Sequence, residues 1–564
     1  MNPSLWRQAQ INHIHGLFKV TDRVYQMRNL DMANMTFIEG DTGVIIIDTT
    51  TKAETAAAGY ELYKKYRGDK PIKAICITHS HTDHYGGILG VTTLDEIKSG
   101  KIPVYAPDGF ILEVMSENVY AGNIMSRRTY NQYGTILPIG PRGQVDDGLG
   151  KTMSSNGTIT IAPPTNTIKE KHETHVIDGV TFEFMLTPHT EAPSEMIMYF
   201  PQFKMLLPAE TVNHTFHNMY TLRGAEVRDV RAWWKAVDDM IERYGDKIDV
   251  MCGVHHWPEW GDRCLALLEL TRDSYKCLHD QCLRLMNHGY TMIEVAEMFR
   301  LPDALGKQWA MRGYYGTWNH SAKAVYQKYL GWFDMVPAHL HNIPPEDAAK
   351  GYVELAGGEA AMLQKIQKEY DTGNYRWAAE IGNQLVFANP KNTDALLLLA
   401  DIYEQLGYQC ENGTWRCVYL MGAYELRLNS EGKSANPKIS TINPTMLDAM
   451  TDEMLFDFTA CHLNMDKAGE EVVTIQFEQT DRKTTWALQI KNGVLNFHQD
   501  KQYPSFDAKV KLPRDAFARL ILGMADVDGL VKDGTIQVDG DVARLKRFFE
   551  LMDVFTLDIN IVTP

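Results

Sequence analysis

Short apolar runs and alternating segments divide the first half of the chain into strands and helices. The stretch NMTFIEGDTGVIIIDTT (34–50) predicts two strands around a Gly-Asp turn, and KAICIT (73–78) predicts a short buried strand. Further strands are predicted in MIMYFPQFKMLLPAE (196–210), whereas AAAGYELYKKY (56–66) has helical spacing. Because strands and helices interleave as far as about Tyr290, we expect an α/β region there.

Helical spacing of the apolar residues takes over from about Thr291 to Leu428. The stretch GNYRWAAEIGNQLVFANPKNTDALLLLADIYEQLGY (373–408) is close to a tetratricopeptide-type helical hairpin with an Asn-Pro turn. One or two such units do not form a solenoid by themselves. We therefore expect a helical region that serves in packing or dimerisation.

The chain then passes through LNSEGKSANPKIST (428–441), a polar linker rich in Ser, Gly and Pro. Beyond it, residues 472–500 alternate like a strand meander, and PRDAFARLILG (513–523) is an amphipathic helix. These patterns predict a separate small α+β domain. The expected domains are 1–290, 291–428 and 442–564, with the linker at 429–441.

Composition and charge narrow the choice of partners. The chain has 564 residues, 44% hydrophobic and 23% charged, which is typical of a soluble globular protein. Its net charge of −16 argues against a nucleic-acid partner, because phosphate binding needs clustered Lys and Arg. An anionic substrate would need a local positive site to overcome repulsion by the negative charge of the chain.

The sequence shows no targeting segment. No run of about eighteen apolar residues appears, so we expect no membrane span. The start, MNPSLWRQAQINHIHG, lacks a basic segment followed by an apolar one. We therefore expect a cytoplasmic protein; a secreted or periplasmic location would apply to a chain already trimmed of its leader.

Eight cysteines are dispersed along the chain. Neither Cys277/Cys282 nor Cys410/Cys417 has the tight spacing of a zinc knuckle. Buried free thiols in a reducing compartment are the favoured interpretation. A disulfide between Cys410 and Cys417 is the alternative.

The stretch THSHTDHYGG follows the predicted strand at 73–78 and carries the clearest chemistry. His79 and His81 are two positions apart, so on an extended segment their side chains point the same way. Asp83 and His84 follow where the chain must turn. The loop thus offers imidazoles for one ion and a carboxylate plus imidazole for a second, a donor set that fits catalytic zinc. A surface loop rich in histidine by chance is the alternative, which the length and specificity of the pattern disfavour.

This pattern resembles the signature of the metallo-β-lactamase superfamily. The resemblance implies an αββα sandwich, further ligands at later strand ends, and an aspartate that closes an early strand. Asp48 in VIIIDTT fits that aspartate and is expected to orient a ligand histidine. Without the resemblance, a turn-initiating aspartate explains Asp48 equally well.

Within that superfamily, three longer blocks are similar to the alkyl sulfatase family: TPHTEAPSEM (187–196), LLPAETVNHTFHNMYTLRGAEVRD (206–229) and GVHHWPEWG (253–261). They occur in the family's order. The resemblance implies that an α-helical dimerisation region and a C-terminal α+β module similar to sterol carrier proteins follow the catalytic domain. It also implies a homodimer.

The resemblance implies the remaining metal ligands. By position they are Glu191 and Glu210, one of them bridging, and His255. His256 is the second choice, since the sequence alone does not decide between the two histidines. Taken singly, each glutamate would be interpreted as a solvated surface residue.

The family's sulfate-binding pair maps to Asn218 and Arg223. A guanidinium fork matches a tetrahedral oxyanion and an amide adds a neutral donor, so Arg223 supplies the local positive site. A surface salt bridge of Arg223 with Glu226 or Asp229 is the alternative. The resemblance implies that Asn218, Arg223 and Glu210 are catalytic.

The resemblance implies hydrolysis of alkyl sulfate esters such as dodecyl sulfate to an alcohol and inorganic sulfate. Two zinc ions per chain would activate the water. Tyr120, Tyr130 and Tyr133 are candidates for contact with the alkyl tail, with core packing as the alternative. Competing functions are a thioesterase, lactamase or phosphoesterase on the same fold, or a non-catalytic lipid-binding protein.

Two positions depart from the family. His189 stands where the family tends to have Gly, and Thr211 stands where it often has Asn. We expect these changes to affect the positioning of substrate more than the binding of zinc.

Overall fold

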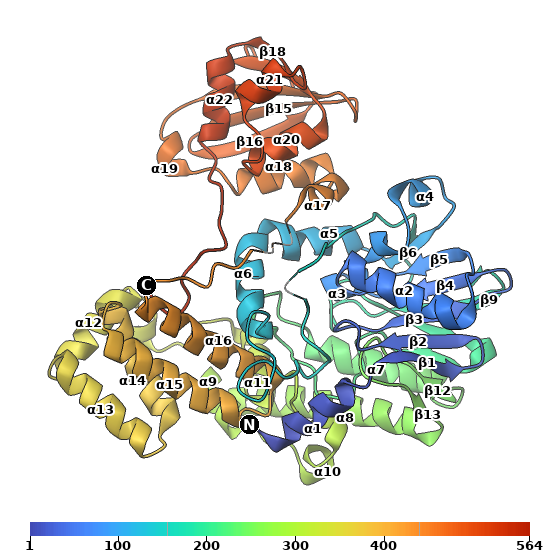
Figure 1. Ribbon diagram of the computed structural model, residues 1–564, viewed down its shortest axis with the longest axis vertical. Helices are drawn as coiled ribbons and strands as arrows, with labels where there is room; N and C mark the ends of the chain where they lie inside the picture. The colour runs from blue at the N-terminus through green and yellow to red at the C-terminus, as the bar shows by residue number, and fades with distance from the viewer. Residues whose placement is uncertain (155, 439, 441) are drawn as a thin grey trace. The chain divides into compact units, whose positions relative to one another are not determined.

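A computed structural model describes residues 1–154, 156–438, 440 and 442–564. The chain divides into two compact units (Figure 1). The first comprises Met1–Glu113, Met125–Ile439 and Asp558–Pro564, and the second comprises Val114–Ile124 and Ser440–Leu557. The predicted catalytic and helical regions therefore belong to one compact unit.

Seven strands form the first sheet of the first unit, in chain order from β1 to β7. Neighbours from β1 to β4 are antiparallel, and those from β4 to β7 are parallel. Every residue of β4 is buried, which is typical of a strand covered on both faces. The strands are β1 (Gly16–Thr21), β2 (Val24–Arg28), β3 (Met35–Glu39), β4 (Val44–Ile47), β5 (Ile72–Cys76), β6 (Val104–Pro107) and β7 (Asn166–Ile168).

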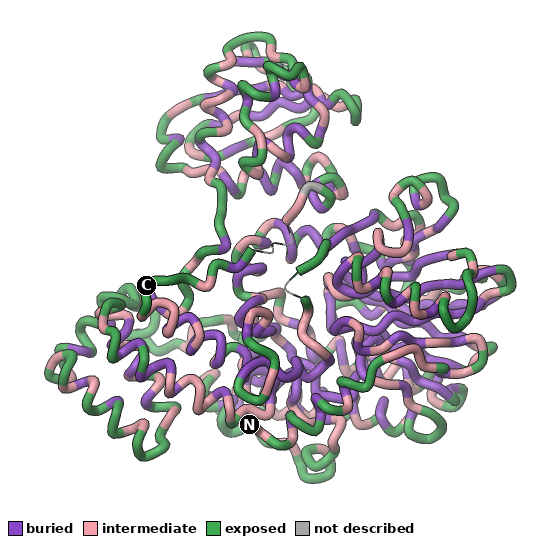
Figure 2. The backbone as a smooth tube through the Cα atoms, viewed as in Figure 1, coloured by how far each residue is buried: buried purple, intermediate pink, exposed green. Residues whose placement is uncertain are grey.

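Six strands form the second sheet in the order β13-β12-β11-β10-β9-β8. One hydrophobic cluster joins residues of both sheets, among them Ile45, Ile47, Phe182 and Met198, so the sheets pack face to face. Figure 2 shows these strands as largely buried. The strands are β8 (His172–Ile177), β9 (Val180–Leu186), β10 (Met196–Phe200), β11 (Met205–Leu207), β12 (Val250–Met251) and β13 (Glu259–Trp260).

Helices cover the outer face of each sheet. On the first sheet lies α2 (Ala53–Arg67), where Gly59 lies against Met27 of β2. On the second lie α7 (Val230–Tyr244) and α8 (Asp262–Asn287), which share a buried cluster with β10 and β11. Asp229 caps α7 by accepting from two backbone N–H groups. The expected αββα sandwich is confirmed.

The helical region follows the sandwich, as predicted. The hairpin expected at 373–408 is formed by α14 and α15, which pack around Leu385 and Leu399. Its helices are α9 (Met292–Met298), α10 (Asp303–Gly306), α11 (Trp318–Leu330), α12 (Pro345–Leu355), α13 (Glu359–Asp371), α14 (Tyr375–Ala388), α15 (Thr393–Gln409) and α16 (Gly413–Ser430). Earlier helices of the chain are α1 (Pro3–Asn12), α3 (Thr82–Tyr85), α4 (Leu94–Lys98), α5 (Phe110–Met115) and α6 (Gly122–Tyr133).

The second unit contains a five-stranded sheet in the order β16-β15-β14-β17-β18. The predicted meander is present, because β14, β15 and β16 pair as antiparallel neighbours. The α+β class of this region is confirmed. Its elements are α17 (Pro444–Ala449), α18 (Asp452–Ala460), α19 (Met465–Ala468), β14 (Val473–Gln479), β15 (Thr484–Lys491), β16 (Val494–Gln499), β17 (Ala508–Leu512), α20 (Arg514–Ile521), α21 (Val527–Lys532), β18 (Gln537–Gly540) and α22 (Val542–Glu550).

All eight cysteines are free, so the Cys410–Cys417 disulfide is not formed. The predicted linker has no regular structure at 433–438, and its residues 439 and 441 lie outside the described part of the chain. None of the helices described here combines the length and apolar character that a membrane crossing requires. The three predicted boundaries, after residues 290, 428 and 441, stay predictions.

Candidate metal centre and anion site

The side chains of the His-rich loop start where two parallel strands end. Asp48 follows β4 directly, and His79 lies three residues after β5. His79 forms an isolated antiparallel bridge with Glu195, which precedes β10. The loop after the carboxyl end of β5 thus meets the start of β10 in the second sheet. Open α/β sheets bind ligands at the carboxyl ends of their strands.

The Gly-Gly pair after the histidines permits a close approach of the backbone. A Cβ at Gly86 would lie 2.3 Å from the carbonyl oxygen of Thr51, and one at Gly87 would lie 2.0 Å from that of Thr49. Both distances are too short for any side chain. The two glycines therefore let the short helix α3 pack directly on the β4–α2 loop.

The first group of converging side chains contains His79, His81, Glu191 and Glu210, all buried. His81 Nδ1 lies 2.7 Å from Glu191 Oε2, and His79 Nε2 lies 3.2 Å from the same oxygen. His79 Nε2 also lies 3.3 Å from Glu210 Oε2. These residues come from the loops after β5, β9 and β11.

The second group contains Asp83, His84, Glu210 and His255. Glu210 Oε2 lies 3.1 Å from His84 Nε2 and 3.1 Å from His255 Nε2. Asp83 Oδ2 lies 3.2 Å from His84 Nε2. Glu210 belongs to both groups, so it would be shared by two ions if each group held one.

Hydrogen bonds at the far ring nitrogens orient three of the histidines. His84 Nδ1 lies 2.7 Å from Asp48 Oδ2, so the predicted contact of Asp48 with a candidate ligand is confirmed. His255 Nδ1 lies 3.1 Å from the carbonyl oxygen of Met32. Thr78 Oγ1 donates to Asp48 and therefore accepts from His79 Nδ1 at 3.0 Å. In all three rings Nε2 is left to face the centre.

The structure distinguishes His255 from His256, which the sequence did not. His256 has a left-handed backbone (φ 59°), and its ring makes different contacts from that of His255. Its Nε2 donates to the carbonyl oxygen of Gly148 at 2.9 Å, and its Nδ1 accepts from the backbone N–H of His214 at 3.3 Å. His256 therefore supports the loops, and His255 joins the centre.

The donor atoms suit divalent metal ions. Four of them are buried and, within the described part of the chain, have close imidazole–carboxylate contacts but no well-formed hydrogen bond: His79 Nε2, His84 Nε2, His255 Nε2 and Glu191 Oε2. Buried polar atoms without partners are costly, and a bound cation would satisfy all four. Imidazole and carboxylate donors without thiolate fit zinc in a catalytic setting.

Arg228, which was not predicted from the sequence, is a buried arginine that joins the two candidate sites. Its guanidinium donates to Glu191 Oε1 and to the side-chain oxygen of Asn218, and at 2.9 Å to the backbone oxygen of Asn218. Although burial opposes ionisation, Arg228 lowers the pKa of Glu191 to about 2. Because arginine only donates, the Asn218 amide is fixed with its oxygen toward Arg228. Its NH₂ group is then available to an anion.

His217 is a second residue that the sequence analysis missed. Its Nε2 lies 2.9 Å from Glu210 Oε1 and 3.5 Å from Glu191 Oε1. It is buried and packs against the ring of Tyr315, with centroids 4.7 Å apart. The only sequence signal was its place beside Asn218. His217 holds the outer oxygen of Glu210, so that Oε2 faces the three histidines.

Arg223 lies on the loop that follows Asn218. Its backbone N–H donates to Gln132 Oε1 at 2.6 Å. Burial raises the pKa of the Tyr133 hydroxyl, and the positive charge of Arg223 opposes this rise. Tyr133 is buried and forms a hydrogen bond with the Tyr315 hydroxyl at 2.8 Å. Asp229, one alternative partner of Arg223, instead caps α7. A series of neighbouring side chains therefore leads through space from Arg223 to Glu210. Its members are Tyr133, Tyr315 and His217.

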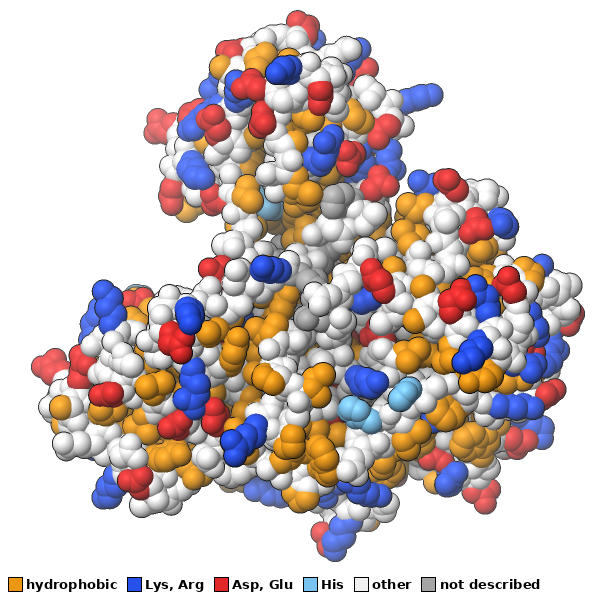
Figure 3. All heavy atoms as spheres, in the orientation of Figure 1, with side chains coloured by type: hydrophobic (Ala, Val, Ile, Leu, Met, Phe, Trp, Pro, Cys, Tyr) orange, Lys and Arg blue, Asp and Glu red, His pale blue; other side chains and the backbone are white. Residues whose placement is uncertain are grey.

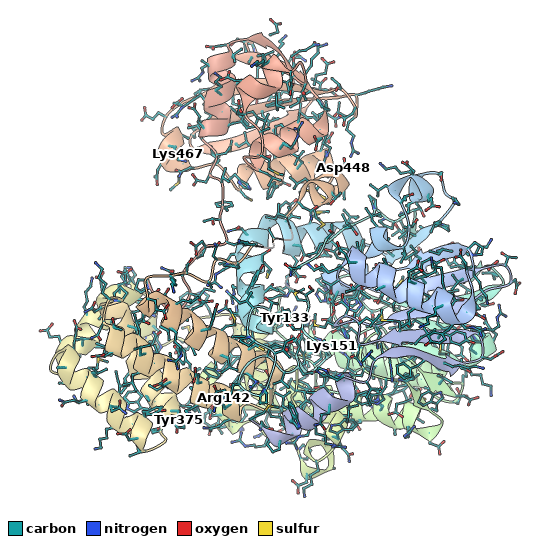
Figure 4. The ribbon with its side chains drawn as sticks, in the orientation of Figure 1. Tyr133, Arg142, Lys151, Tyr375, Asp448 and Lys467 are labelled. Atoms are coloured by element: carbon teal, nitrogen blue, oxygen red, sulfur yellow. The ribbon has the colours of Figure 1, made fainter. Side chains whose placement is uncertain are left out.

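The three candidate tyrosines have different surroundings. Tyr133 lies at the end of α6, beside the long loop that carries Lys151 (Figure 4). Tyr130 packs with Leu137 and Leu420, and its hydroxyl accepts from the backbone N–H of Lys438. Tyr120 belongs to the second unit. Their contact with the substrate tail stays a prediction.

The two departures from the family have simple structural settings. His189 is exposed and has a left-handed backbone (φ 64°), a conformation that glycine adopts without strain. The glycine that the resemblance leads one to expect there would fit this backbone. Thr211 is buried, and its hydroxyl donates to Glu195 Oε1 at 3.0 Å.

Three family models match successive parts of the chain. The model of the metallo-beta-lactamase superfamily matches residues 28–256. The model described as alkyl sulfatase dimerisation matches 291–429, and the one described as alkyl sulfatase C-terminal matches 440–564.

Individual relatives are similar along the entire chain. A linear primary-alkylsulfatase of a Pseudomonas species is 46% identical over 564 residues, covering 100% of this chain and 83% of the relative. An alkyl/aryl-sulfatase of Saccharomyces cerevisiae is 44% identical, covering 100% and 86%. The solved structure of a stereoselective inverting sec-alkylsulfatase from a Pseudomonas species superposes with a TM-score of 0.94 at 44% identity, covering 100% and 88%. The chain therefore belongs to the alkylsulfatases, a family of sulfuric ester hydrolases within the metallo-β-lactamase superfamily.

Proposed function

We propose that this enzyme hydrolyses alkyl sulfate esters such as dodecyl sulfate, with two zinc ions per chain. One water is consumed, and the products are an alcohol and hydrogensulfate. One observation carries the proposal: Arg228 contacts both Glu191, a member of the first ligand group, and Asn218, a member of the proposed anion site. The family membership supports the same reaction.

Seven residues would hold the ions. Zinc bound there lowers the pKa of water, so that hydroxide is available near neutral pH. The protein orients the ligand histidines through Asp48, Thr78 and Met32, and keeps Glu191 ionised through Arg228. The proposed ligands are His79, His81, Glu191 and Glu210 for one ion, and Asp83, His84, Glu210 and His255 for the other.

The sulfate group would bind between Asn218 and Arg223. The Asn218 NH₂ donates to one sulfate oxygen, because its carbonyl oxygen is already held by Arg228. The Arg223 guanidinium donates to the others and offsets their charge, which the acidic chain as a whole would repel. These donors also stabilise the charge that develops on the departing sulfate.

The apolar tail has suitable surroundings beside the same loop. A cavity of about 660 Å³ is lined by Tyr220 and Leu222, which precede Arg223 in sequence, and by Trp415 of α16. We propose that the tail occupies this cavity, with Tyr133 near the sulfate end. Apolar walls favour a long alkyl chain over a short one, at about 0.8 kcal/mol per buried methylene group.

Turnover of a substrate panel tests this function. We expect sulfate release from dodecyl sulfate, with a lower KM than for a short-chain sulfate, and little hydrolysis of a β-lactam or a thioester. Comparable hydrolysis of the lactam or the thioester would contradict the assignment. Equal KM values for long and short sulfates would contradict the tail site alone.

We propose a homodimer formed through the helical region. Exposed apolar side chains are concentrated there, and Figure 3 shows apolar groups among the charges on that surface. Exposed apolar patches mark interfaces. A solution mass of one chain, measured by sedimentation, would contradict the proposal. The apolar residues are Trp332, Met335, Leu340, Ile343, Tyr352 and Leu355.

A further inference from the structure

Glu195 is a buried carboxylate that belongs to neither ligand group. It is 1% exposed and precedes β10. Its Oε2 lies 2.5 Å from Thr190 Oγ1, and it accepts from the Glu191 N–H at 3.0 Å and from the Ala192 N–H at 3.3 Å. Its Oε1 accepts from the Glu210 N–H at 3.2 Å and from Thr211 Oγ1 at 3.0 Å.

The same residue also contacts the His-rich loop through its backbone. Glu195 and His79 form an antiparallel bridge, and the Glu195 carbonyl oxygen accepts from the Thr187 N–H at 2.9 Å. Three segments that carry candidate ligands, from the ends of β5, β9 and β11, therefore meet at one residue. Each oxygen of the carboxylate holds the backbone of a different glutamate ligand.

We propose that Glu195 is a positioning residue that holds Glu191 and Glu210 at the separation needed to bind the ions. This inference rests on the proposed function. Three backbone N–H groups and the Thr211 hydroxyl donate to its two oxygens, so a carboxylate meets a requirement that an amide does not. Glutamine would turn its NH₂ group toward two of these donors, and one ligand loop would move.

The test is the zinc affinity of Glu195→Gln, measured by competition with a chromophoric chelator. We expect affinity to fall about 10- to 100-fold, the range typical for groups that orient metal ligands. The matched control is Glu425→Gln, which also removes a buried carboxylate from the first unit. Glu425 accepts from Arg127 at 2.8 Å and Asn131 at 3.2 Å, on α6. The Glu425→Gln variant should lose folding stability and keep wild-type zinc affinity.

Equal zinc affinity in folded Glu195→Gln and wild type would overturn the inference. If this variant does not fold, Thr211→Val decides, because it removes one donor to Glu195 and keeps the carboxylate. We expect it to weaken zinc binding several-fold, and unchanged affinity would again overturn the inference. Failure of the proposed function is separate, because it would appear in the wild type as absent zinc binding or absent sulfate release.

Discussion

Replacement of Glu210 by glutamine is expected to remove bound metal and to lower sulfate-ester turnover by more than about 100-fold, beyond the loss typical for groups that only orient ligands. Glu210 belongs to both candidate groups, and its Oε2 lies 3.1 to 3.3 Å from Nε2 of three histidines. An amide keeps the shape of the side chain but removes the negative charge that both ions would share. Metal content by emission spectrometry and sulfate release by ion chromatography measure the two effects.

Glu39→Gln is the matched control for this variant. Glu39 is a buried carboxylate of the same unit, and it pairs with Arg67 at 2.9 Å and Lys70 at 2.8 Å. Its loss should cost stability and leave metal content and turnover near wild type. Full metal content with normal turnover in Glu210→Gln would refute the bridging role.

Arg223→Ala is expected to lower kcat/KM for dodecyl sulfate by about 10²- to 10³-fold, as loss of a donor to developing negative charge does in other enzymes. Zinc content should stay at the wild-type level, because Arg223 is outside both candidate ligand groups. Steady-state kinetics and metal analysis of the same preparation test both statements. Loss of zinc, or unchanged turnover, would remove Arg223 from its proposed role.

Arg228→Met provides the contrast. Arg228 contacts both Glu191 and Asn218, so its loss should weaken zinc binding and turnover together. Breaking a buried ion pair also costs about 3–5 kcal/mol of stability, so folding must be checked by circular dichroism. The control is Arg231→Ala, at an exposed position of α7, which should change neither zinc binding nor turnover. A different split, with zinc lost from Arg223→Ala and kept in Arg228→Met, would exchange the proposed roles of the two arginines.

Patterns of spacing predicted the parts of the centre that are local in sequence. His79, His81, Asp83 and His84 come from one loop, so their spacing alone indicated two ligand sets. Glu191 and Glu210 were found only through the family resemblance, because a single glutamate carries no pattern. The fold was predictable for a similar reason, since strands such as β4 and helices such as α2 have strong local periodicity.

The residues that sequence analysis missed act through long-range contacts. Arg228 contacts Glu191, 37 positions earlier, and Glu195 contacts the Glu210 backbone, 15 positions later. Nothing in the local pattern separates Arg228 from Arg223, or Glu195 from Glu191. The choice between His255 and His256 depended on a left-handed backbone at His256. A histidine in the sequence does not predict that backbone conformation.

The most direct test of the central claim is metal-dependent sulfate release. Dodecyl sulfate is incubated with protein loaded with zinc, with protein stripped by chelator, and with stripped protein to which zinc is restored. The two-zinc account predicts release by the first and third samples, and about two zinc ions per chain, one for each ligand group. Equal release by stripped protein, or no release from protein that holds two zinc ions, would contradict it.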